Sequence, residues 1–161
     1  MSYVITIPPT TRQRYLGGMA ALNLPSDKGT GDWHLIQTFF RERKHLPLFF
    51  ITGEGCLTNT NPLLGDVGIY DCTSALKGIS VPHEGDKAYA ASHARAIADL
   101  VIGTILRGGS PAFVGLDDWM PRDSDKQEVF DLLDLALSGL TTHHQDQVLE
   151  WKDKNRLDRE Y

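Results

Sequence analysis

Long hydrophobic runs are absent from this sequence, and cysteine is scarce. No apolar stretch approaches the roughly 18 residues that a membrane-spanning helix needs, so we expect no membrane association. The N-terminal residues lack the basic segment and apolar core of a secretory signal. The two cysteines, Cys56 and Cys72, form no CxxC pair, which favours two reduced thiols over a disulfide and predicts a cytoplasmic protein.

A strong excess of charge is also lacking. The formal net charge is −5, from 16 basic and 21 acidic residues, which gives no general attraction to nucleic acid or to anionic membranes. Hydrophobic residues make up 41% and charged residues 23% of the 161 residues, as in ordinary globular chains. A chain of this length can bury a core without a metal or a disulfide. We therefore expect a single domain over residues 1–161, with no cofactor and no nucleic-acid partner.

The pattern of the chain changes near its middle. In the first half, short apolar segments that end at turn residues predict strands at 3–7, 46–52 and 66–72. Between the first two of these, residues 33–43 have helical spacing, and Asp32 stands at the N-cap position.

The second half predicts helices. Residues 86–107 carry two adjacent apolar stripes and end at Gly108 and Gly109, which predicts a long buried helix. Two further helices are expected after residues 124–127 and 142–145, which match the capping-box pattern. Strands first and helices later indicate an α+β fold, with short N-terminal strands packed against the long helix and two C-terminal helices.

The most distinctive segment for function is the glycine-rich stretch 21–34. It leads into the expected helix start at Asp32, Trp33 and His34, where free backbone N–H groups attract an anion or a carboxylate. Lys28 would add positive charge there. The stretch matches neither GxxxxGK[ST] nor GxGxxG, so a tight connection with an ordinary helix cap is the alternative.

A second candidate is the sequence SHAR at 92–95, within the expected long helix. His93 falls on the apolar stripe, whereas Arg95 falls on a more polar one and can pair with Asp99. A buried His93 beside Arg95, opposite the glycine-rich stretch, would form an anion or carboxylate site. The alternative is a core histidine and a structural ion pair.

The sequence contains no strong catalytic motif. The histidines show no HxH or HExxH spacing, so no metal site is expected. There is no GxSxG, and neither cysteine has a histidine partner in a known arrangement, which argues against nucleophilic catalysis. The acidic residues that flank 119–121 would suit a cation, a basic partner or solvent.

The motifs ALNLP at 21–25, GTGDWH at 29–34 and SHARAIADLV at 92–101 resemble those of a group of small, largely uncharacterised bacterial proteins. Some of those proteins are encoded beside toxin-like partners in toxin–antitoxin arrangements. The resemblance implies a cytoplasmic accessory protein and no established catalytic residue. The chain departs from common DNA-binding antitoxins because it has neither an evident helix-turn-helix nor a strongly basic arm.

Three functions are compatible with these features. The leading hypothesis is a non-enzymatic binding protein, an antitoxin-like neutraliser of a basic protein partner, since complementary charge accelerates encounter. The second is a small enzyme that acts on a phosphorylated or nucleotide-like substrate at the two candidate segments. The third is a structural protein that forms homo-oligomers through Phe113, Trp119 or Trp151. The candidate binding residues are Lys28, Asp32, Trp33, His34, His93 and Arg95.

Overall fold

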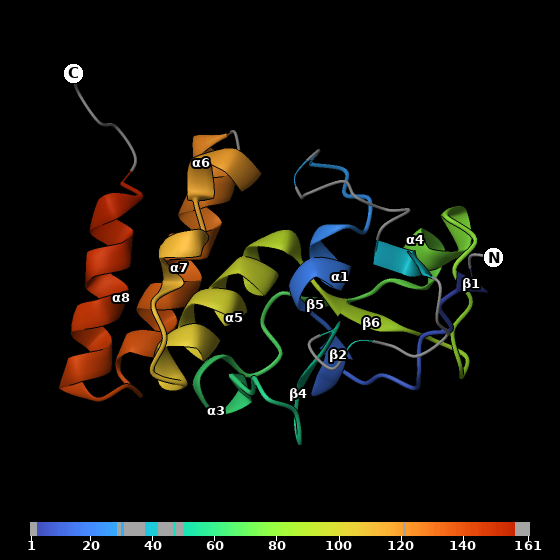
Figure 1. The fold of residues 1–161 in the computed structure, drawn as a ribbon, viewed down its shortest axis with the longest axis horizontal. Helices are drawn as coiled ribbons and strands as arrows, with labels where there is room; N and C mark the ends of the chain where they lie inside the picture. The colour runs from blue at the N-terminus through green and yellow to red at the C-terminus, as the bar shows by residue number, and fades with distance from the viewer. Residues whose placement is uncertain are drawn as a thin grey trace.

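The computed structural model describes residues 3–28, 30, 38–41, 47, 50–120 and 122–156, and these form an α+β fold. The strands are β1 (Tyr3–Val4), β2 (Arg14–Leu16), β3 (Phe40–Arg41), β4 (Ile51–Gly53), β5 (Ile69–Asp71) and β6 (Tyr89–Ala91). The helices are α1 (Gly18–Leu22), α3 (Asn61–Leu64), α4 (Thr73–Gly78), α5 (His93–Leu106), α6 (Leu116–Trp119), α7 (Asp123–Leu137) and α8 (Thr142–Lys154). Helices α8, α7 and α5 occupy one end of the long axis, whereas the sheet, α4 and β1 extend toward the other (Figure 1).

The main sheet has four strands in the order β4-β2-β6-β5. Its outer pairs are antiparallel, but the central strands β2 and β6 are parallel, with Leu16 opposite Ala90. Each central strand runs directly into a helix, β2 into α1 and β6 into α5. Because the two strands point the same way, both helices begin at the same edge of the sheet, and α1 packs on α5.

The sheet separates two hydrophobic cores. Tyr15, Ile69 and Ala91 belong to the core formed with α5, α7 and α8. The neighbouring residues Leu16 and Ala90 belong to the core on the other face, with β1 and α4. Successive side chains of a strand point to opposite faces, so strands only three residues long contribute to both cores.

Helix α5 is the central element of the helical end. Ser92 caps it, since the Ser92 hydroxyl accepts from the Arg95 N–H at 3.1 Å. The helix ends before Gly108, whose φ of +82° suits a glycine C-terminal stop, as the sequence predicts. It packs against α1, α7 and α8, so it is the long buried helix that the sequence predicts.

The predicted start of this helix at residue 86 is wrong. Residues Tyr89–Ala91 form strand β6, and the helix begins only at His93. Small apolar residues such as Ala90 and Ala91 continue a helical pattern equally well. Pairing with β2 and β5 decides the outcome, since tertiary contacts override local propensity.

Among the described residues, the predicted helix at 33–43 ends earlier than expected. Thr38 and Phe39 are helical, but Phe40–Arg41 form β3, which pairs antiparallel with β1. Residues 33–37 and 42–43 lie outside the described residues. The aromatic spacing of Phe39 and Phe40 fits a strand end as well as a helix face, and the pairing with Val4 selects the strand.

The predicted strands exist in shorter form. The 3–7 segment pairs as β1 at its start, and Ile7 adds an isolated parallel bridge to His83. The described part of the 46–52 segment forms β4 from Ile51 onward, and the 66–72 segment forms β5 from Ile69 onward.

Both capping-box assignments are incorrect. Helix α7 begins at Asp123, so Ser124 lies inside it, and Arg122 at the N-cap provides no side-chain cap. Helix α8 is capped by Thr141, whose hydroxyl accepts from the His144 N–H at 3.3 Å. The sequence-based register was therefore one residue too late at Thr142.

Two sequence predictions concern the chemistry of the chain as a whole. Cys56 and Cys72 are both free thiols, half-buried and buried respectively, in agreement with the preference for reduced cysteines. Among the described residues, no helix combines the length and apolar character that crossing a bilayer requires.

Candidate functional site

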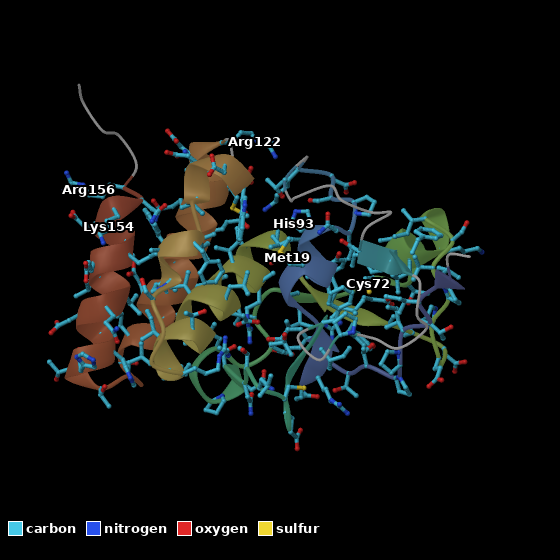
Figure 2. The ribbon with its side chains drawn as sticks, viewed as in Figure 1. Met19, Cys72, His93, Arg122, Lys154 and Arg156 are labelled. Atoms are coloured by element: carbon cyan, nitrogen blue, oxygen red, sulfur yellow. The ribbon has the colours of Figure 1, made fainter. Side chains whose placement is uncertain are left out.

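A pocket of about 740 Å³ lies between the sheet end and the helical end of the molecule. Its walls come from residues 25–28 and 30, from β5 and α4, and from the first turns of α5 and α7. His93, at the start of α5, lines it, and Figure 2 shows this residue between Cys72 on the sheet side and Lys154 on α8. The volume falls within the range of small-ligand sites in proteins.

His93 is fixed at both ring nitrogens. Its Nε2 lies 2.8 Å from the Leu24 carbonyl oxygen, and its Nδ1 lies 2.5 Å from the Thr30 hydroxyl. A carbonyl oxygen can only accept, so Nε2 carries the proton and donates to Leu24. In the neutral ring Nδ1 is then the acceptor, and the Thr30 hydroxyl donates to it.

Burial keeps this imidazole neutral. The side chain of His93 is 5% exposed, and desolvation lowers the pKa of His93 below its ordinary value of 6.5. The Leu24 and Ala21 carbonyls and the Asp125 carboxylate act in the opposite direction and are outweighed. At neutral pH the ring is therefore uncharged, and Nδ1 carries a lone pair.

Thr30 of the glycine-rich stretch and His93 of the SHAR sequence meet in this pocket, as a site common to both segments requires. The contact is the Thr30–His93 hydrogen bond. Asp32, Trp33 and His34 lie outside the described residues, so their predicted role remains a prediction.

Lys28 lies on the pocket wall but is already paired. Its ammonium group binds the Glu128 carboxylate and lies 4.0 Å from Asp125 Oδ1. Arg122 strengthens the same junction, because it donates to the Lys28 carbonyl and, at 2.8 Å, to Asp125 Oδ2. Lys28 is thus joined to the first two turns of α7, and Glu128 compensates the positive charge of its ammonium group.

Carboxylates dominate the charge of the pocket. Among the described residues, four carboxylates line it, at Asp27, Asp71, Asp125 and Glu128, and the cations beside them are Lys28 and Arg122. Asp125 is 3% exposed, so part of this charge is held away from water. Such a site favours a cationic group and disfavours a phosphate.

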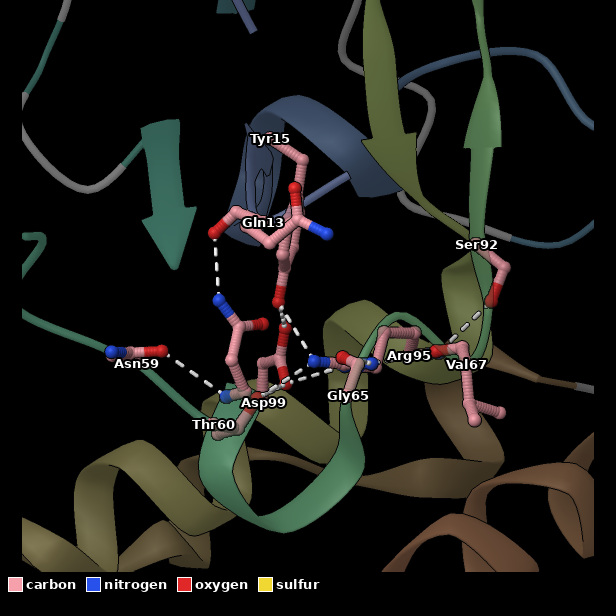
Figure 3. Close-up of polar contacts among 10 residues, drawn as sticks. Gln13, Tyr15, Asn59, Thr60, Gly65, Val67, Ser92, Arg95 and Asp99 are labelled. Atoms are coloured by element: carbon pink, nitrogen blue, oxygen red, sulfur yellow. Dashed lines mark hydrogen bonds and ion pairs between the residues drawn. The ribbon is translucent and has the colours of Figure 1, made fainter. Parts of the chain in front are cut away.

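Arg95 does not face a ligand. Its guanidinium has five N–H donors, and its Nε–H donates to Asp99 Oδ1 at 2.9 Å. The other donors reach Gly65 O (3.0 Å), Val67 O (2.6 Å), the Tyr15 hydroxyl (3.1 Å) and the Thr60 hydroxyl (3.0 Å), as Figure 3 shows. Arg95 is 0% exposed and all its donors are satisfied within the chain, so the structural ion pair is the correct alternative for Arg95 and Asp99.

The carboxylate at the centre of this network is equally saturated. Asp99 Oδ1 also accepts from the Thr60 hydroxyl, and Oδ2 accepts from the Tyr15 hydroxyl, both at 2.5 Å. Burial, reinforced by the negative charge of Asp99, raises the pKa of the Tyr15 phenol far above its ordinary value. The network ties β2, the start of α3 and α5 together, and it positions the SHAR turn without contributing to the pocket's chemistry.

Several of the pocket residues were not predicted from the sequence. Thr30 lies within GTGDWH but was not among the candidate residues, and Asp71 is the last residue of the short strand β5. Asp125 and Glu128 are three residues apart on one helix and so share a face. That spacing could have been read from the sequence, but their position opposite residues 25–28 depends on the tertiary fold.

Comparison with known families, curated proteins and solved structures finds no match. Within the described ranges, no group of three or more histidine, cysteine, aspartate or glutamate side chains is arranged to hold a metal ion. The function therefore has to be inferred from the pocket itself.

Proposed function

We propose that this chain is a cytoplasmic protein-binding module that receives a basic partner at the acidic pocket. In this proposal it acts as an antitoxin does, by covering a functional surface of the partner. The observation that carries the proposal is the charge of the pocket: four carboxylates line it, and Lys28 and Arg122 pair with Glu128 and Asp125, which leaves the negative charges of Asp27 and Asp71 in excess.

The acidic character continues beyond the pocket onto the neighbouring surface. Asp117, the second residue of α6, and Asp123, the first residue of α7, have side chains 84% and 68% exposed. Their common cationic neighbour, Lys126, binds Asp117 and lies 3.9 Å from Asp123. A face of this sign attracts a basic partner at long range and accelerates its encounter, with an effect that salt screens.

The lining of the pocket suits a long basic side chain. Ala75, Ile79 and Met120 provide apolar wall against which the methylene groups of a lysine or arginine can pack. The charged head group would meet the carboxylates of Asp27 and Asp71, since Glu128 and Asp125 already pair with Lys28 and Arg122. A planar guanidinium pairs with two carboxylate oxygens at once, so arginine is the better fit.

The two other functions have less support. An enzyme for phosphorylated substrates needs cationic or N–H donors, but Arg95 is saturated and Lys28 is paired with Glu128. For self-association, Trp151 is 3% exposed and its indole N–H donates to Val114 O at 3.0 Å, so it is unavailable as an anchor. Phe113 is 61% exposed and remains the candidate anchor for a homo-oligomer.

The proposal is tested by affinity capture of the tagged chain from its host, followed by binding measurements with the recovered partner. Glu128→Lys and Asp27→Lys reverse charge at the pocket, and each should weaken binding at least tenfold and reduce its salt dependence. Asp146→Lys, an equal change on the exposed face of α8, is the matched control and should bind as the native chain does. Equal loss in all three variants, or none, would refute recognition by the pocket.

A further inference from the structure

Thr30 and His93 form a hydrogen bond in which the hydroxyl donates to the imidazole, as a nucleophile donates to its base. The Nε2–H of His93 is committed to the Leu24 carbonyl, so the Nδ1 lone pair receives the proton of the Thr30 hydroxyl at 2.5 Å. In nucleophilic enzymes a hydroxyl is activated by an adjacent base that a third group orients. Here the Leu24 carbonyl is that third group, and it also fixes the tautomer.

The pair is held rigidly and kept in its reactive protonation state. His93 is the first residue of α5, directly after the Ser92 cap. Thr30 is 1% exposed and His93 is 5% exposed, so water competes little for the hydrogen bond. The uncharged imidazole retains its lone pair at neutral pH, as a general base must.

Both residues line the 740 Å³ pocket, as does Ala94. Ala94 is the second residue of α5, and N–H groups in the first turn of a helix have no partner within that helix. Such N–H groups favour negative charge at this point, as develops on the oxygen of a carbonyl under attack. A nucleophile, a base and a polar N–H environment therefore adjoin one cavity.

The surrounding charge restricts the substrate. Asp71, Asp125 and Glu128 line the same cavity and would repel an anionic substrate. We propose that Thr30 and His93 are a catalytic pair that hydrolyses an uncharged or cationic carboxylic ester through an acyl-threonine intermediate. This activity goes beyond the binding of a basic partner and does not depend on it.

The reaction balances with the groups present. Thr30 Oγ1 attacks the ester carbonyl carbon, and its proton passes to His93 Nδ1. The bond to the leaving alcohol then breaks, and Nδ1 returns the proton to that alcohol. Water attacks the acyl-threonine in the same way, releasing the carboxylic acid and restoring the Thr30 hydroxyl. The net reaction is ester plus water to acid plus alcohol.

The test uses the full chain with p-nitrophenyl acetate as an uncharged ester and p-nitrophenyl hemisuccinate as an anionic one. Released nitrophenolate is followed by absorbance, and acid-quenched samples are mapped by mass spectrometry. The expected result is an acetyl adduct on Thr30, with the anionic ester reacting at least tenfold more slowly. Absence of an adduct on Thr30 in the folded native chain overturns the proposal.

Three variants and one control separate catalysis from structural support. Thr30→Val removes the hydroxyl at nearly constant volume and should abolish turnover, whereas Thr30→Ser should retain it. His93→Gln can still donate to Leu24 but has no base, and should react about 100-fold more slowly. Ser138→Ala removes an exposed hydroxyl at the end of α7, outside the pocket, and should react as the native chain does. Each variant is checked for native near-UV circular dichroism. Turnover in folded Thr30→Val equal to that of the native chain would refute the assignment.

Discussion

The Arg95 guanidinium donates to the Asp99 carboxylate 2.9 Å away, one turn along α5, and both side chains are almost completely buried. A charge pair in such a place is rarely worth much more than a well-packed apolar pair, yet breaking it is costly because one charge is left without a partner. All five N–H donors of Arg95 are hydrogen-bonded within the chain, which indicates that its role is to join segments distant in the sequence.

The first prediction follows from this pair. Arg95→Met should lower the free energy of unfolding by about 3–5 kcal/mol, because it leaves Asp99 buried without its cationic partner. Urea denaturation provides the measurement. The control is Lys154→Ala, which breaks another i,i+4 ion pair, with Glu150 at 3.1 Å, where both side chains are 65% exposed. That change should cost less than about 1 kcal/mol, and a similar cost at both positions would contradict the buried network.

A second prediction concerns acid stability. Burial lowers the pKa of His93 from 6.5, so below this pH the unfolded chain binds a proton that the folded chain does not. Unfolding then takes up a proton, and His93 makes the protein less stable as pH falls, by up to about 1.4 kcal/mol per pH unit. Urea unfolding between pH 7.5 and 5 measures this slope.

His93→Gln is the matched variant for the acid measurement, since glutamine does not titrate. Its stability should fall less steeply than that of the native chain over the same interval. The Asp71 pKa is lowered by its hydrogen bonds to Thr73, which adds a loss of stability at lower pH in both proteins. Parallel curves for the two proteins above pH 5 would show that His93 is not buried as the structure has it.

The sequence predicted the class of fold and the main helix, and it failed where tertiary pairing decides. The apolar stripes of 93–106 and the glycine stop at Gly108 are local features, so they could be read directly. Strand β6 could not, because Ala90 and Ala91 become a strand only through β2 and β5. Strand β2 and helix α1 carry no periodic pattern long enough to detect.

The candidate site also combines residues that the sequence could indicate with contacts that only the tertiary fold creates. Lys28 was predicted from its glycine-rich context and His93 from its place on the apolar stripe of the expected long helix, and both line the pocket. The partners that define their chemistry come from elsewhere in the chain, namely Leu24, Thr30 and Glu128. A sequence motif indicates which groups are present, whereas the hydrogen bonds decide which lone pairs and charges remain available.

A third prediction distinguishes the two cysteines. Cys72 is 1% exposed, and burial, with a smaller contribution from Asp71, raises the pKa of its thiol to about 12. The reactive thiolate is therefore scarce at pH 8. With a disulfide reagent such as dithionitrobenzoate, half-exposed Cys56 should react first, and Cys72 at least about 100-fold more slowly, because its buried thiol is rarely deprotonated and is shielded from the reagent. The Cys56→Ser variant should leave only the slow phase, and two fast thiols would be the contrary result.

The last prediction tests the start of α8. The Thr141 hydroxyl accepts from the His144 N–H, whereas Thr142 is the first residue of the helix and is exposed. Thr141→Ala should therefore cost about 1 kcal/mol of unfolding free energy, as the loss of an N-cap does. Thr142→Ala changes the same side chain one residue later and should be close to neutral, since alanine is also the better helix former. Chemical denaturation of the two variants compares them directly. A larger loss in Thr142→Ala would restore the capping box that the sequence alone suggested.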